Sequence, residues 1–110
     1  MKAKIDTGGL GRSGAKLTRK VLEEFDLDEH ELVILREAAR TVDTLDALAL
    51  VIAKEGPMSE DRVHPAVVES RQLRLTLARL FASLRLPSGD GEDARPQRRG
   101  AARGTYGGAS

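Results

Sequence analysis

The sequence predicts an all-α fold of three helices with one long central helix, followed by a disordered C-terminal tail. Apolar residues recur at helical spacing in three stretches between residues 13 and 87. From residue 88 onward, glycine, arginine and acidic residues replace nearly all large apolar side chains, so burial cannot offset the entropy of ordering. We therefore expect a flexible basic arm at residues 1–12, a helical domain at 13–87 and a disordered tail at 88–110.

The first helix is expected from about Gly14 to Phe25, with Leu17 and Val21 on its apolar side. Its cations crowd the positive N-terminal end of the helix and its acids the negative C-terminal end. Each misplaced exposed charge costs about 0.3–1 kcal/mol. A sequence that breaks a local rule more often serves a site than a fold. The simpler alternative is an ordinary solvated face.

The long central helix has clear signals at both ends. Asp28 and Glu31 form a capping box, and Gly56-Pro57 stops the helix about 27 residues later, which gives a rod of about 40 Å. Apolar residues cover about half of its circumference, more than one neighbouring helix can cover. Asp46 falls inside this apolar arc. It either pairs with a cation there or lies at the rim and reaches water.

The third helix is expected from His64-Pro65 to about Arg85 and has two apolar stripes. Leucines and Phe81 form the main stripe, and a second one repeats every seven residues on the opposite side. Two apolar faces on one helix predict two neighbours, one of them from another subunit. The residues expected at an interface between subunits are Leu35, Val42, Leu45, Ile52, Val68, Leu75 and Ala82.

Assembly is the expected source of additional stability, because a core of this size is marginal by itself. The chain has no cysteine, and its two histidines stand 34 positions apart, so neither a disulfide nor a structural zinc site is predicted. The longest apolar run, Ala47–Ala53, is far shorter than the roughly 20 residues of a membrane span, and no signal peptide opens the chain. A soluble, intracellular protein that does not contact membranes is expected.

Motifs for catalysis or cofactor binding are incomplete. Gly9-Leu-Gly-Arg-Ser-Gly14 fits a dinucleotide-binding pattern, but no buried strand precedes it and no βαβ unit follows. Ala15 stands where a phosphate-binding loop requires lysine, so the glycines are interpreted as part of a mobile arm. Asp26-x-Asp28-x-His30 lacks the glycine of a calcium loop and is interpreted as a helix cap. No catalytic residue, metal or cofactor is predicted, and the protein is expected not to be an enzyme.

Charge is sorted along the chain. The first twenty residues hold six cations and one anion, whereas residues 21–87 hold eight cations and thirteen anions. Such segregation indicates a polyanionic partner. The residues expected to contact such a polyanion are Lys2, Lys4, Arg12, Lys16, Arg19 and Lys20. A rival cationic surface on the third helix comprises Arg71, Arg74 and Arg85. In the tail, Arg95, Arg98, Arg99, Arg103 and Tyr106 either bind a partner or merely keep the chain soluble.

An ordered set of residues resembles the small terminase subunits of tailed double-stranded DNA phages. The set comprises Leu10-Gly-Arg-Ser-Gly14, Leu17, Val21, Phe25-x-Leu27, Glu31-Leu32, Leu35, Ala38-Ala39, Asp43, Leu45-Asp46 and Val63-His64-Pro65, followed by the leucine-rich third helix. Thr18 stands where relatives often carry a tryptophan. The resemblance implies a non-catalytic subunit in the host cell cytoplasm that assembles into a homo-oligomeric ring. Such a subunit binds the packaging-initiation site of viral DNA and recruits the large terminase subunit, an ATPase and nuclease.

The competing interpretation is a helical protein-interaction or assembly module that does not bind DNA. In that case the basic segments would only keep the protein soluble. Salt dependence separates the two, because a phosphate-binding protein loses affinity steeply as salt rises.

Overall fold

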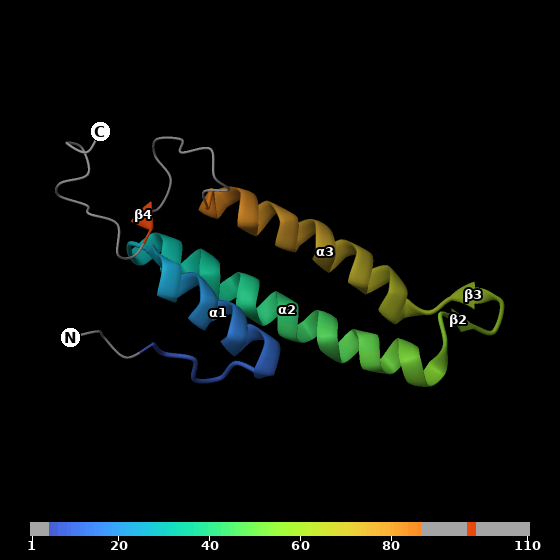
Figure 1. Cartoon of the computed structure of the whole chain (residues 1–110). Coiled ribbons are helices and arrows are strands. Elements are labelled where there is room, and N and C mark those ends of the chain that lie inside the picture. The colour runs from blue at the N-terminus through green and yellow to red at the C-terminus, as the bar shows by residue number, and fades with distance from the viewer. Residues whose placement is uncertain (1–4, 87–96, 99–110) are drawn as a thin grey trace, which may run out of the picture.

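The computed structural model describes residues 5–86 and 97–98. Three helices dominate: α1 (Arg12–Glu24), α2 (Glu29–Glu55) and α3 (Pro65–Leu84). Four short strands accompany them: β1 (Phe25–Asp26), β2 (Met58–Ser59), β3 (Arg62–Val63) and β4 (Gln97–Arg98). Both α1 and α3 run antiparallel to α2, α3 along most of it and α1 along its N-terminal half only (Figure 1). The predicted all-α class with a long central helix is confirmed.

Helix α2 has the bounds that the sequence predicted, because both signals act locally. The Glu31 N–H donates to Asp28 Oδ1 at 3.1 Å, and the Asp28 N–H donates to Glu31 Oε1 at 2.9 Å, which completes the capping box. At the other end Gly56 has a φ of 87°, and its N–H donates to Ile52 O at 2.7 Å. Glycine adopts this conformation without the steric cost that a side chain would add.

Helix α3 begins at Pro65, directly after a histidine cap. The Ala66 N–H donates to His64 Nδ1 at 2.9 Å, so this ring nitrogen carries no proton. The proton of the neutral ring is then on Nε2, which lies 2.7 Å from Glu55 Oε1 at the end of α2. His64 therefore joins the last turn of α2 to the first turn of α3. The helix ends at Leu84, with Arg85 in the left-handed conformation.

The strands were not predicted, since two-residue strands show no alternation in sequence. Strands β2 and β3 form an antiparallel hairpin between α2 and α3, with Met58 opposite Val63. Strand β4 pairs antiparallel with β1, so that Arg98 faces Phe25. Gln97 and Arg98 belong to the segment expected to be disordered, but the structure pairs them with β1. The remaining residues of the segment 88–110 lie outside the described part of the chain.

The apolar core lies where the end of α1, the start of α2 and the end of α3 meet. Val21, Phe25, Leu35 and Leu84 form it. Next to it, Ala38 and Ala39 are fully buried, and their small side chains allow the neighbouring helices to approach α2 closely. Among the described residues, no helix is both long enough and apolar enough to cross a membrane.

Candidate nucleic-acid interface

The N-terminus of α1 is held by a carboxylate from α2. The N–H groups of Gly11 and Gly14 each donate to one oxygen of Asp43, at 2.7 Å in both cases. A carboxylate at the positive end of a helix dipole is stabilising, and here it also satisfies two free backbone donors. This contact explains why α1 begins at Arg12, two residues before the start that the sequence predicted. A cap from a distant residue leaves no local signal.

Gly14 is required by the close approach of α1 to α2. A Cβ at this position would lie 2.6 Å from Ala39 O and closer still to Asp43 Oδ2. Both distances are well below van der Waals contact, so any side chain would force the two helices apart. Gly14 thus has a packing role in addition to donating its N–H to Asp43.

Gly8, before α1, and Ser13, in its first turn, also contact α2. The Arg36 guanidinium donates to Gly8 O, and the Ser13 hydroxyl donates to Asp46 Oδ2. Gly8 and Gly11, within the segment expected to be an arm, thus contact α2. Asp46 is exposed and bonded to a hydroxyl, so the interpretation as a rim residue was right and the cationic partner is not needed. Residues 1–4 lie outside the described part of the chain.

The two sides of α1 differ completely in chemistry. Its inner side buries four small or apolar residues, Gly14, Ala15, Thr18 and Val21. The Thr18 hydroxyl donates to Gly14 O at 2.9 Å, so this buried polar group is satisfied. The outer side carries four exposed cations, which we call the α1 basic face: Arg12, Lys16, Arg19 and Lys20. Three of these, Arg12, Lys16 and Arg19, follow one another at helical spacing along one line of the surface.

The other predicted contacts are distributed as follows. Lys2 and Lys4 lie outside the described residues, as do Arg95, Arg99, Arg103 and Tyr106. Arg98 is described through its strand pairing. The rival cations Arg71 and Arg74 are exposed on α3, and Arg85 is exposed directly after it. They are separate from the α1 basic face, so the structure offers two cationic surfaces.

The residues expected at a subunit interface divide into three groups. Leu35 is only 1% exposed and lies in the core of the single chain, so it is not available to a second subunit and is removed from the set. Val42, Leu45 and Ile52 are partly buried along α2. Val68 and Leu75 are 47% and 58% exposed, and Ala82 is exposed on the same side of α3. The second stripe of α3 is thus open to solvent.

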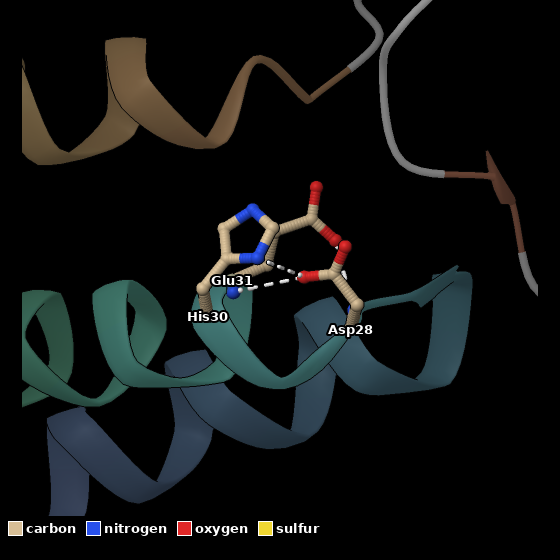
Figure 2. Close-up of side chains that lie close together, drawn as sticks. All are labelled: Asp28, His30 and Glu31. Carbon is tan, nitrogen blue, oxygen red and sulfur yellow. Dashed lines mark hydrogen bonds and ion pairs between the residues drawn. The ribbon is translucent and has the colours of Figure 1, made fainter.

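Among residues 5–86 and 97–98, one group of potential metal ligands occurs, at the start of α2 (Figure 2). Ligand atoms of Asp28, His30 and Glu31 lie within 4.8 Å of one another. However, Asp28 Oδ1 accepts the Glu31 N–H and also lies 3.1 Å from His30 Nδ1, and the His30 side chain is 80% exposed. The geometry is that of a capping box with an adjacent histidine, as the sequence indicated, and it gives no ground for a metal site.

Asp43 and Arg36 are the important residues whose roles the sequence did not reveal. The available signal was indirect: Gly11 and Gly14 stand at the start of a helix without a local capping side chain. Comparisons with protein-family models, curated proteins and solved structures found no match to this chain.

Proposed function

We propose that this protein is a non-catalytic DNA-binding subunit for viral genome packaging, which acts as a homo-oligomer and binds double-stranded DNA through the α1 basic face. The observation that carries the proposal is the fixed presentation of Arg12, Lys16, Arg19 and Lys20 on a helix anchored at its N-terminus by Asp43. Anchored cations lose less conformational freedom on binding than cations on a free arm. Phosphate contacts of this kind position a protein on a duplex without reading its sequence.

The anchoring also limits which groups contact phosphate. A helix N-terminus commonly binds phosphate through its free N–H groups. Here the N–H groups of Gly11 and Gly14 are already bonded to Asp43. Contact with DNA should therefore come from the lysine and arginine side chains. We expect binding that is strongly salt-dependent and only weakly sequence-selective, with bendable sequences preferred.

The resemblance to small terminase subunits supplies the biological part of the proposal. A subunit of that kind recognises the packaging-initiation site in the host cell cytoplasm and recruits the large terminase subunit. The exposed stripe of Val68, Leu75 and Ala82 on α3 supports self-assembly, since apolar surface of this kind is commonly covered by a partner. An assembled ring would repeat the α1 basic face around its circumference and multiply the weak contacts of each subunit.

The decisive experiment compares two triple variants with the wild-type protein in titrations of a short mixed-sequence duplex at several salt concentrations. In the first variant Lys16, Arg19 and Lys20 are changed to alanine. Its affinity should fall, and the slope of log K against log salt should flatten by about 0.9 for each phosphate that the variant no longer neutralises. In the matched control Arg71, Arg74 and Arg85 are changed to alanine. The control should retain most of the affinity and the slope.

The remaining outcomes are equally informative. A loss of affinity confined to the control variant moves the DNA site to α3. Absence of salt-dependent duplex binding in the wild-type protein refutes the DNA-binding function and favours the protein-interaction module. Mass measurement of each variant must show the same oligomer, so that a change in affinity is not caused by a change in assembly.

A further inference from the structure

The hairpin end of the molecule carries a hollow that the proposed DNA contact does not use. It has a volume of about 820 Å³ and lies between the β2–β3 hairpin and the first turn of α3. Its apolar part consists of Val63, Pro65 and Val68. Val63 is 41% exposed, and its partner across the hairpin, Met58, is exposed as well. These side chains form an apolar surface that is open to a partner.

The charge around the hollow is negative. Glu60, Asp61 and Glu69 line it together with the single cation Arg62. Three carboxylates repel a phosphate backbone, so this surface is unsuited to DNA and suited to a cationic segment with an apolar or aromatic anchor.

Glu60 is held in an unfavourable backbone conformation at the tip of the hairpin. Its φ is 60°, in a region that L residues other than asparagine and aspartate rarely adopt and that glycine adopts freely. Strain of this kind is concentrated at functional positions. A glutamate here places a carboxylate at the rim of the hollow where glycine would be the easier residue for the turn.

The end of the chain has the complementary chemistry. Residues 99–110 contain Arg99 and Arg103, no acidic residue, and Tyr106 as their one aromatic side chain. A tyrosine offers an apolar ring and a hydroxyl, which suits a hollow with an apolar floor and a polar rim. The glycines around Tyr106 allow the backbone to approach a surface closely.

The tail of a given chain reaches the hollow of the same chain only in a nearly fully extended conformation, which costs conformational entropy. Strand β4 pairs with β1 at the end of α2 opposite the hairpin (Figure 1). Leu84 packs with Phe25 at the β1 end, and Val68 in the hollow precedes Leu84 by 16 residues of α3, or about 24 Å. Tyr106 follows Arg98 by eight residues, which span at most about 29 Å when fully extended.

We propose that the segment from Arg99 to Tyr106 of one copy binds the hairpin hollow of a second copy. The contact joins two different surfaces, so its repetition gives a closed ring or an open chain of subunits. It deepens the self-assembly part of the proposed function and is independent of the DNA-binding part.

The chain has no cysteine, so pairs of full-length single-cysteine variants can test the contact by disulfide formation without DNA. Tyr106→Cys mixed with Val68→Cys should give the mixed disulfide in several-fold excess over Tyr106→Cys mixed with Val33→Cys. Val33 is 65% exposed near the opposite end of α2 and controls for random collision. Adding Glu60→Lys and Asp61→Lys to the Val68 variant should remove the excess. Adding Arg99→Glu and Arg103→Glu to the Tyr106 variant should then restore it.

Equal yields at Val68 and Val33, or an excess that survives the change of Glu60 and Asp61 to lysine, would overturn the inference. So would a disulfide formed within one chain when Tyr106→Cys and Val68→Cys are combined in one molecule and diluted with wild-type protein. Circular dichroism of each variant shows that the helices are retained. If the wild-type protein shows no salt-dependent duplex binding but the mixed disulfide forms, only the DNA-binding function is refuted. If the wild-type protein binds the duplex but the mixed disulfide shows no excess, only this contact is refuted.

Discussion

The two halves of α2 have the same type of sequence but different surroundings. In the N-terminal half, α1 and α3 cover both sides, and Leu35, Ala38 and Ala39 are almost completely buried. In the C-terminal half α1 reaches only as far as Asp46, so beyond this residue only α3 is present, and Leu50 is 74% exposed. The cause is length, because α1 has 13 residues against 27 in α2, or about 20 Å against 40 Å. A wide apolar arc thus finds both neighbours within the chain in one half and only one in the other.

The two ends of the molecule, beside the two halves of α2, also differ in charge. The half of the molecule that holds α1 presents the α1 basic face, whereas the hairpin end presents Glu60, Asp61 and Glu69. A polyanion and a cationic peptide should therefore bind at separate places on one subunit. The difference allows each activity to be removed by mutation without disturbing the other.

The largest contrast is expected from one substitution made at two positions of α2. Leu35→Ala removes a core side chain and should lower the free energy of unfolding by about 2–5 kcal/mol. Leu50→Ala changes an exposed side chain and should alter it by no more than about 0.5 kcal/mol. Urea denaturation at one fixed protein concentration measures both values. A large decrease with Leu50→Ala would mean that the C-terminal half is covered by a second copy in solution.

Gly14→Ala should destabilise the protein, whereas most glycine-to-alanine substitutions within helices are stabilising. Replacing glycine within a helix by alanine normally stabilises the helix by about 0.5–1 kcal/mol. At Gly14 the added methyl group would overlap Ala39 O and the Asp43 carboxylate, so we expect a decrease of about 1–3 kcal/mol in the free energy of unfolding. Gly8→Ala is the control, because its Cβ would meet only the exposed Asp6 carboxylate at 3.3 Å. A stabilised Gly14→Ala protein would contradict the close helix approach.

How far the sequence predicts this fold depends on whether each signal is local. Both ends of α2 and the start of α3 are set by local signals, namely Asp28 with Glu31, Gly56 and His64-Pro65, and these predictions were confirmed. The start of α1 is set by Asp43, which is 32 residues from the Gly11 donor. A tertiary cap has no local pattern, so the sequence did not predict the contact between Gly11 and Asp43.

The candidate site shows the same difference between features that a local pattern predicts and features that depend on tertiary contacts. Helical periodicity alone assigned Lys16, Arg19 and Lys20 to the outer side of α1, and they are exposed there. Periodicity did not distinguish Leu35 from Val42, Leu45 and Ile52, which were expected together at a subunit interface, although Leu35 lies in the core of the single chain and the others are only partly buried. The hairpin and its acidic hollow were missed, since their strands are too short to show a pattern.

His64→Ala should have a moderate effect at the junction of α2 and α3. It removes the cap at the Ala66 N–H and the interaction with Glu55, and the removal of a helix cap typically costs about 1 kcal/mol. His64→Asn retains an acceptor for the Ala66 N–H and should recover part of that stability. Thermal unfolding of the three proteins at equal concentration gives the order. An unchanged midpoint for His64→Ala would show that the junction is held by packing alone.

The smallest expected effect comes from two glycine substitutions in the hairpin, which distinguish the effect of backbone strain at Glu60 from the effect of losing a carboxylate. Glu60→Gly relieves a left-handed φ and should raise the free energy of unfolding by about 0.5 kcal/mol, the difference between the strain removed and the backbone entropy that glycine adds. Asp61→Gly removes the same charge from the next residue, which has no positive φ, and should lower it by about 0.5 kcal/mol. Both variants should reduce the mixed disulfide between Tyr106→Cys and Val68→Cys. If Glu60→Gly is more stable but forms less of this disulfide, then Glu60 contributes to binding at a cost in folding stability. If the yield of the disulfide is unchanged, Glu60 has no part in the contact.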